Sequence, residues 1–174
     1  MTDTSILCYH EHLVLAVPEG FDVNQAHQQK RLPPSMLKTG IFDVPVDMCE
    51  SLNDFAGVPF LMLRNGNYLR QCVDSLFQEC HMAPEIAMEP EQSAVSYNFA
   101  SMGIGAAILS NMLVEDSFKN SRLCFYKINS RLALRDTWLA YRNHCYISYA
   151  MKTFIEMLTE KGLPFRLAAP SSFL

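Results

Sequence analysis

Apolar residues along this chain fall into short uninterrupted runs, separated by stretches with helical spacing. Six runs have the length and the turn-forming flanks of buried strands: 12–17, 59–63, 85–88, 106–109, 123–128 and 137–142. Apolar residues also recur at i, i+3, i+4 and i+7 over 69–80 and over 147–158, which predicts two amphipathic helices. A shorter helix is predicted over about 93–102, with Gly103 at its C-terminal cap.

The alternation of strands and helices through the middle of the chain predicts the fold class. It is typical of an α/β protein with a mainly parallel open sheet flanked by helices. Residues 21–45 interrupt the alternation, because their periodicity is weak and they contain prolines and a glycine. They are predicted to form an irregular excursion with at most one short helix. Asp47 followed by Glu50 resembles a capping box, which predicts a short helix over about 48–55.

The overall composition narrows the class of protein. The chain has 174 residues, 49% hydrophobic and 18% charged, which is ordinary for a globular domain with a real core. Its net charge of -4 and the lack of a long Lys/Arg cluster argue against direct nucleic-acid binding. No apolar run approaches the roughly 20 residues that span a bilayer, and no signal-peptide pattern opens the chain. We expect a cytoplasmic location, in which the six cysteines stay reduced.

Histidine and cysteine residues offer two routes to chemistry, and neither has the required spacing. Cys8, His10 and His12 share one face if they lie on one strand, but same-face neighbours stand roughly 6.5–7 Å apart, which strains a shared metal site. The pairs Cys80-His81 and His144-Cys145 would have to converge in space to form a catalytic dyad, and sequence neighbours rarely do so. No phosphate loop, dinucleotide fingerprint or serine elbow occurs. We expect no metal, no cofactor and no enzyme; a thiol- or metal-dependent enzyme is an alternative without a supporting motif.

Two predicted strand-to-helix crossings are the candidate ligand-binding positions. In open α/β sheets, ligands bind beyond the carboxyl ends of parallel strands, where helix N-termini present free N–H groups. The first crossing carries Arg64, Asn65 and Asn67; Asn67 is a suitable N-cap, and Arg64 suits a carboxylate. The second crossing carries Gln92 and Ser93 just ahead of a helix. An ordinary polar loop is the alternative at each crossing.

Four stretches of the chain, each a predicted strand or a helix with an adjoining strand, follow one another in an order that can be compared with known families. They are His12-Leu13-Val14-Leu15-Ala16-Val17-Pro18, then Leu52 to Phe60, then Pro84 to Leu109 with its Gly103-Ile104-Gly105 turn, and a final Leu-Ala-Tyr-Arg strand followed by a helix with Phe154-Ile155. Together they resemble the effector-binding domain of LysR-type bacterial transcription regulators. The resemblance extends from about residue 7 to residue 160.

This resemblance implies a periplasmic-binding-protein-like lobe with one or more antiparallel edge strands. Residues 7–143 would form the second lobe of the effector-binding domain, and residues 144–162 the helix that normally packs on the first lobe. Residues 163–174 would be a loose tail. The family's winged helix-turn-helix and much of its first lobe have no counterpart in this sequence, and residues 21–50 are longer than the family's usual connection.

The resemblance also implies a function, that of an effector-sensing domain in transcription regulation. A small molecule, such as a carboxylate or an amino acid, would bind in an interlobe cleft formed by the two crossings, with Met102 and Gly103 nearby. DNA would be contacted only through the helix-turn-helix. The wide apolar face of the last helix predicts a homo-oligomer, because such a face seldom stays exposed. The alternative is an oligomerisation or interaction fragment without a functional ligand site.

Overall fold

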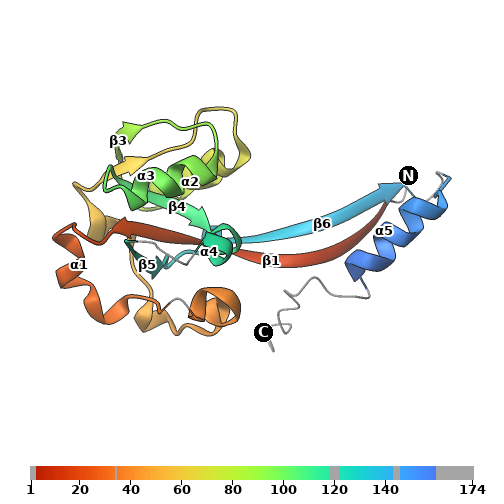
Figure 1. Cartoon of the computed structure of the whole chain (residues 1–174), viewed down its shortest axis with the longest axis horizontal. Coiled ribbons are helices and arrows are strands. Elements are labelled where there is room, and N and C mark those ends of the chain that lie inside the picture. The colour runs from red at the N-terminus through yellow and green to blue at the C-terminus, as the bar shows by residue number, and fades with distance from the viewer. Residues whose placement is uncertain (1–2, 34, 118–121, 143–145, 160–174) are drawn as a thin grey trace. The chain divides into compact units, whose positions relative to one another are not determined.

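The computed structural model comprises two compact units (Figure 1). It describes residues 3–33, 35–117, 122–142 and 146–159. One unit, the sheet unit, is His12–Leu134; the other, the terminal unit, combines the described residues of Met1–Glu11 and Arg135–Leu174. The strands and the α-helices are β1 (Asp3–Pro18), α1 (Val23–Ala26), β2 (Pro59–Leu61), α2 (Tyr68–Glu79), β3 (Glu85–Met88), α3 (Ser93–Ser101), β4 (Ala106–Ser110), α4 (Asn111–Ser117), β5 (Leu123–Lys127), β6 (Leu134–Arg142) and α5 (Tyr149–Thr159).

The sheet unit is built on a mixed sheet with the strand order β3-β2-β4-β1-β5. Strand β2 pairs in parallel with β3 and β4, whereas β1 pairs antiparallel with β4 and β5. The predicted α/β class with an open, helix-flanked sheet is therefore confirmed. An edge strand with antiparallel pairing is also present, since β5 lies at one edge and pairs antiparallel with β1. The internal position of β1, antiparallel to both of its neighbours, was not predicted. A continuous apolar run marks a strand covered on both faces, but it does not say which neighbours the strand has.

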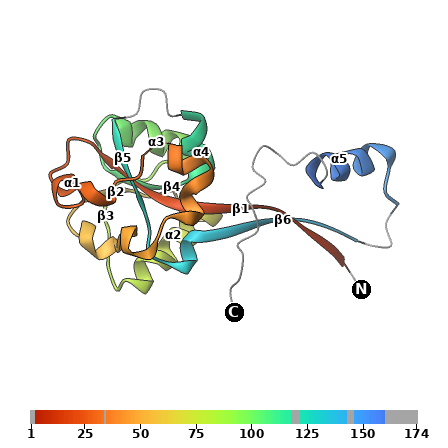
Figure 2. The same ribbon diagram turned by 90° about the horizontal axis from the view of Figure 1, so that it is seen from below.

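Apolar side chains on the two faces of this sheet form two separate clusters. Successive residues of β1 alternate between them, with Leu13 in the first and Val14 in the second. Helix α2 covers the first face through Leu76 and Phe77, and α3 covers the second face through Tyr97. Figure 2 shows these two helices on opposite sides of the sheet. Coverage of both faces explains why the strand sequences are continuously apolar instead of alternating.

The caps of α2 and α3 are those that the sequence predicts. The Asn67 side chain accepts a hydrogen bond from the backbone N–H of Leu69 at 2.8 Å, and α2 begins at Tyr68. Helix α3 ends at Ser101, and Gly103 follows with a φ of +85°. This left-handed conformation favours glycine and lets the chain turn directly into β4.

The excursion between β1 and β2 is a series of short helical turns that pack beside β5. Besides α1, the turns are Gln28–Lys30, Met36–Gly40, Ile41–Asp43, Val46–Met48 and Leu52–Phe55. The predicted capping box at Asp47 and Glu50 is wrong. The box is formed by Ser51 and Asp54, three residues apart like the predicted pair, and it starts a single turn instead of a helix over 48–55. Glu50 lies in a β-bridge with Ile128, which keeps it out of any helix.

The terminal unit contains the first part of β1, strand β6 and helix α5. Strand β6 pairs with β1, and α5 confirms the helix predicted from the apolar spacing over 147–158. The predicted tail at 163–174, the helix end at 160–162 and the His144-Cys145 pair lie outside the described residues. No helix among the described residues is long and apolar enough to cross a membrane.

Candidate ligand site at the carboxyl ends of the parallel strands

The two predicted crossings meet at one edge of the sheet. Strands β2 and β3 are parallel neighbours, so the residues that follow them emerge side by side. The backbone N–H of Met62 donates to the carbonyl of Met88 at 3.1 Å, and the N–H of Arg64 donates to the carbonyl of Pro90 at 3.0 Å. Residues 63–65 and 89–93 therefore form one continuous surface, the β2–β3 site.

The Arg64 side chain in this site already holds a carboxylate. Its Nη1 lies 2.5 Å from Oε1 of Glu91, and the two side chains are 65% and 70% exposed. An exposed ion pair contributes little to stability, because water solvates both charges almost as well when they are apart. The pair therefore leaves Arg64 able to exchange Glu91 for another anion at low cost.

A second arginine, Arg70 on α2, binds the backbone and a carboxylate of the β2–β3 site. Its Nη1 donates to the carbonyl of Leu63 at 2.5 Å and to Glu89 at 2.8 Å, and its Nε donates to Asp74 at 2.9 Å. The hydrogen bond to Glu89 is the main reason that the pKa of Arg70 is raised. Sequence analysis missed Arg70, because one arginine outside the apolar stripe of a helix carries no signal except the Asp74 four residues later.

The remaining predicted residues differ in their availability to a ligand. The carbonyl oxygen of the Asn67 side chain is committed to capping α2. Gln92 precedes the first turn of α3, and among the described residues its side chain makes no capping bond. Ser93 begins the helix, and Asn65 is exposed. Gln92 and Ser93 thus present an amide, a hydroxyl and helix N–H groups beside the Arg64–Glu91 pair.

Met102 and Gly103 do not belong to this surface, which corrects the expectation that they lie near the crossings. They follow the C-terminal end of α3 and lead to the start of β4, where the Pro59 carbonyl lies so close to Gly105 that a Cβ there would be 2.7 Å away. Helix α3 runs from the end of β3 to the start of β4, and these strands point the same way. Its two ends consequently lie at opposite edges of the sheet.

Strand β4 ends at the same edge of the sheet as β2 and β3. The next residue, Asn111, is buried and makes polar contacts. The Oδ1 atom of Asn111 accepts the backbone N–H of His12 at 2.9 Å, and its Nδ2 donates to the carbonyl of Leu37 at 3.3 Å. The imidazole of His12 lies 2.7 Å from the Leu13 carbonyl through Nδ1. Burial lowers the pKa of His12 to about 4, so the ring is neutral near pH 7.

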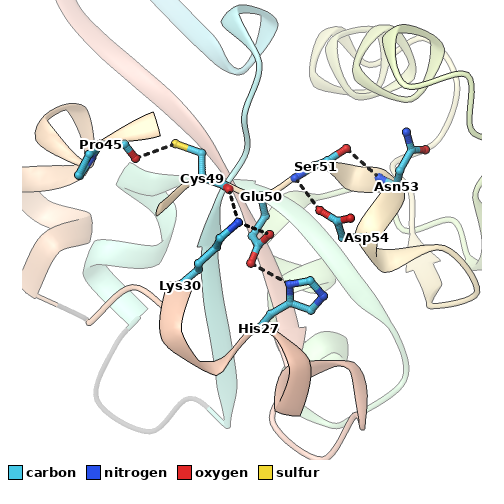
Figure 3. Close-up of polar contacts among 8 residues, drawn as sticks. All are labelled: His27, Lys30, Pro45, Cys49, Glu50, Ser51, Asn53 and Asp54. Atoms are coloured by element: carbon cyan, nitrogen blue, oxygen red, sulfur yellow. Dashed lines mark hydrogen bonds and ion pairs between the residues drawn. The ribbon is translucent and has the colours of Figure 1, made fainter. Parts of the chain in front are cut away.

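A second cluster of charges lies beside β5, and its carboxylate is buried (Figure 3). Glu50 is only 2% exposed; its Oε1 lies 2.8 Å from His27 Nδ1, and its Oε2 lies 3.2 Å from Lys30 Nζ. Lys30 also donates to the Cys49 carbonyl at 3.1 Å. Since both carboxylate oxygens are occupied within the fold, this Glu50 cluster holds the excursion in place and does not face a ligand.

His10 and His12, considered as metal ligands, each contact a protein group within their own unit. His10 lies 2.6 Å from Asp136 within the terminal unit, and the His12 ring is held by the Leu13 carbonyl in the sheet unit. In the described part of the chain, no group of three or more His, Cys, Asp or Glu side chains is placed to hold a metal ion.

Comparison with known protein families assigns this chain to a family. Residues 48–162 match the model of the LysR substrate binding domain. The chain belongs to the LysR substrate-binding domain family. This family consists of transcription regulators, which are not enzymes.

Two curated relatives from Bacillus subtilis (strain 168) are HTH-type transcriptional regulators. YybE is 34% identical over 83 residues, which is 47% of this chain and 28% of that protein. YcgK is 24% identical over 154 residues, which is 86% of this chain and 44% of that protein. The LysR-family chain thus spans less than half the length of these relatives.

Solved structures of LysR effector-binding domains share the fold. The effector-binding domain of QuiR in complex with shikimate matches with a TM-score of 0.66 and 19% identity, over 95% of this chain and 68% of that chain. The Synechocystis PCC6803 CcmR regulatory domain in complex with 2-PG matches with a TM-score of 0.68 and 15% identity, over 94% and 68%. The BenM effector binding domain with its effector benzoate matches with a TM-score of 0.64 and 17% identity, over 99% and 68%.

Proposed function

We propose that this chain is the effector-sensing part of a LysR-type transcription regulator and acts in the cytoplasm. Family membership supports a regulatory role, and the ligands named for QuiR, CcmR and BenM support a small-molecule effector. An effector regulates by binding one arrangement of the protein more tightly than another, which shifts the population of the arrangement that controls transcription. Contact with DNA is assigned to the helix-turn-helix of the whole regulator.

The β2–β3 site is the proposed position of this effector, and the Arg64–Glu91 pair supports an anionic ligand. In this pair Arg64 binds a carboxylate at 2.5 Å in an exposed position. A carboxylate of the effector replaces Glu91 on the guanidinium, and Gln92 and Ser93 supply neutral hydrogen-bonding groups next to it. An amino acid is the second ligand class, because the released Glu91 carboxylate then receives its ammonium group.

Calorimetric titration of the chain with small carboxylates, including shikimate and benzoate, tests this proposal. Replacement of a charge-assisted hydrogen bond changes affinity by about tenfold or more, so Arg64→Gln should weaken the carboxylate that binds the wild-type chain. Arg131→Gln removes an exposed arginine elsewhere in the sheet unit and serves as the matched control. The proposal is abandoned if no carboxylate binds, or if both variants bind like the wild type.

A second candidate function is an interaction module, and one observation favours it. The described residues of the terminal unit expose several large apolar side chains on β6 and α5: Trp138, Tyr149, Met151, Phe154 and Met157. Large exposed apolar patches usually mark contact surfaces. We propose that a second copy of the chain covers this surface in a homo-oligomer.

Analytical ultracentrifugation of the chain should show a dimer or a larger species, which Phe154→Glu dissociates. Lys152→Glu, on the same helix, is the control and should leave the oligomer intact. A monomeric wild-type chain contradicts the proposed homo-oligomer.

A further inference from the structure

A cavity of about 360 Å³, the loop cavity, lies in the sheet unit directly after the end of β1. It is lined by Glu19, Gly20, Phe21, Asp22, Asn24, Gln25, Gln28, Arg31 and Cys124. This loop cavity lies near the end of β1 and the start of β5, at the sheet edge opposite to the β2–β3 site. All its lining residues except Cys124 precede residue 48, where the match to the family begins. The wall of the cavity is therefore formed almost entirely by the segment between β1 and β2.

The wall of the loop cavity is anchored to β5 at both ends. The backbone N–H of Glu19 donates to the carbonyl of Arg122 at 2.8 Å, and the N–H of Leu32 donates to the carbonyl of Phe125 at 2.8 Å. These two hydrogen bonds hold both ends of the segment 19–32 against neighbouring residues of the sheet unit. A backbone that is fixed before a ligand arrives lowers the entropic cost of binding.

The half-buried side chain of Asn24 fixes the loop from within. The Nδ2 atom of Asn24 donates to the carbonyls of Pro18 at 2.7 Å and Phe21 at 3.0 Å, and its Oδ1 accepts the hydroxyl of Tyr126 at 2.9 Å. Tyr126 is fully buried in the core cluster under α2. One amide thus connects the cavity wall to the sheet through two hydrogen bonds, with Pro18 and Tyr126, and to the loop itself through the third.

The Glu50 cluster fixes the other side of the same segment. Figure 3 shows His27 and Lys30 directed at the Glu50 carboxylate. The next residues in sequence, Gln28 and Arg31, line the cavity. A buried carboxylate therefore sets the position of the short turn that carries the cavity's amide and its cation.

The charges that line the cavity match a zwitterion. Arg31 Nη1 and Glu19 Oε1 are 3.7 Å apart, beyond hydrogen-bond distance, and the two side chains are 43% and 57% exposed. This loose pair offers one cation and one anion that are not saturated by each other. A simple anion would meet the carboxylates of Glu19 and Asp22 beside Arg31, whereas a zwitterion satisfies both signs. Gln25 and Gln28 add neutral amides for a polar substituent.

We propose that the loop cavity is a second ligand site, which binds a small zwitterion of the amino-acid class. Its carboxylate binds Arg31, and its ammonium group binds Glu19. The volume lies at the lower end of ligand pockets, roughly 300–1,000 Å³, which suits a molecule of this size. This site is independent of the β2–β3 site, since it uses neither Arg64 nor the residues after β3.

Amide chemical-shift titration of the full chain with the standard amino acids at millimolar concentration tests the proposal. At least one should shift the amides of residues 19–31, while its N-acetyl and carboxamide derivatives, which lack one of the two charges, should not. Arg31→Gln and Glu19→Gln should each weaken binding by about tenfold or more. Both side chains are exposed, so the variants keep the fold, and their amide spectra verify this.

The control is Arg122→Gln, which removes a nearby exposed charge and keeps the carbonyl that accepts the Glu19 N–H. It should bind like the wild type. The proposal is overturned if no amino acid shifts residues 19–31, if the shifts fall on 63–65 and 89–93 instead, or if Arg31→Gln and Arg122→Gln have equal effects.

Discussion

Two of the carboxylate–cation clusters in the sheet unit look alike in distance and differ in their environment. The Arg64–Glu91 pair spans 2.5 Å with both partners exposed, and Glu50 meets His27 at 2.8 Å and Lys30 at 3.2 Å with its carboxylate buried. An exposed pair exchanges partners easily, whereas a buried carboxylate that loses its partners has no water to replace them. Burial, and not bond length, therefore separates a group that can serve a ligand from one that holds the fold.

The largest expected effect comes from breaking the buried cluster. Glu50→Gln should lower the free energy of unfolding by about 3 kcal/mol, because Lys30 and His27 lose their charged partner. Glu91→Gln is the matched substitution at the exposed pair and should change it by less than about 1 kcal/mol. Urea denaturation followed by circular dichroism measures both. Equal effects of the two substitutions would remove the distinction between the clusters.

The next effect is a pH dependence that arises from His12, which lies within β1 beside the end of β4. Burial lowers the pKa of His12 from 6.5 to about 4 in the folded state. Between these values the unfolded chain binds a proton that the folded chain does not, so stability falls as the pH falls from 6.5. The total loss is of order 3 kcal/mol, because each pKa unit corresponds to about 1.4 kcal/mol.

Denaturation curves between pH 7 and 4 measure this slope, and His12→Gln should reduce it. The control is His81→Asn, at an exposed position with a φ of +52° that asparagine tolerates. A slope that is the same in His12→Gln and in the wild type would show that His12 does not titrate in this window.

A smaller effect is expected at Arg70, which lies beneath the exposed pair. Arg70→Gln removes hydrogen bonds to Glu89 and Asp74 from a side chain that is only 10% exposed. The loss should be about 2 kcal/mol, typical of hydrogen bonds to charged groups. Arg64→Gln, on an exposed arginine of the same site, should have almost no effect on thermal unfolding. If Arg70→Gln changed stability as little as Arg64→Gln does, the hydrogen bonds of the buried Arg70 side chain would not be needed to stabilise the site.

The smallest expected change in stability, at Glu91→Gln, is also the sharpest test of ligand access. The substitution removes the carboxylate that occupies Arg64, so a small carboxylate no longer has to displace it. Affinity should rise several-fold, with stability changed by less than about 1 kcal/mol. Glu85→Gln, on the exposed strand β3, is the control for the lost negative charge. Titration calorimetry would contradict this mechanism if Glu91→Gln weakened the binding of carboxylates.

Local patterns predicted much of the fold. The period of apolar residues located α2 and α5, Gly103 marked the end of α3, and the short side chain of Asn67 located the start of α2. Helix α4 was missed, because seven residues do not form a full periodic stripe. The capping box was misplaced by four residues, since Asp47/Glu50 and Ser51/Asp54 have the same spacing and only the fold selects between them.

The candidate site was predicted in part. The two crossings meet as expected, because consecutive strands paired in parallel, but Arg64 is paired with Glu91, which strand pairing alone brings into reach. Met102 and Gly103 were placed at the wrong edge of the sheet. They are close in sequence to the second crossing, but α3 carries the chain from that edge to the opposite one. The pairing of Glu50 with His27 and Lys30 carried no sequence signal, since these partners lie about twenty residues away.

By itself, the sequence determined most of the segments that become strands and helices, since these depend on apolar periodicity and on caps within a few residues. It also determined the family, through stretches whose order survives low identity. Only the tertiary structure decided that β1 is internal, that Glu50 is buried and that Arg64 is exposed. Strand order and burial are set by contacts between residues far apart in the chain, and the free energy of a charge depends on the solvent that those contacts leave around it.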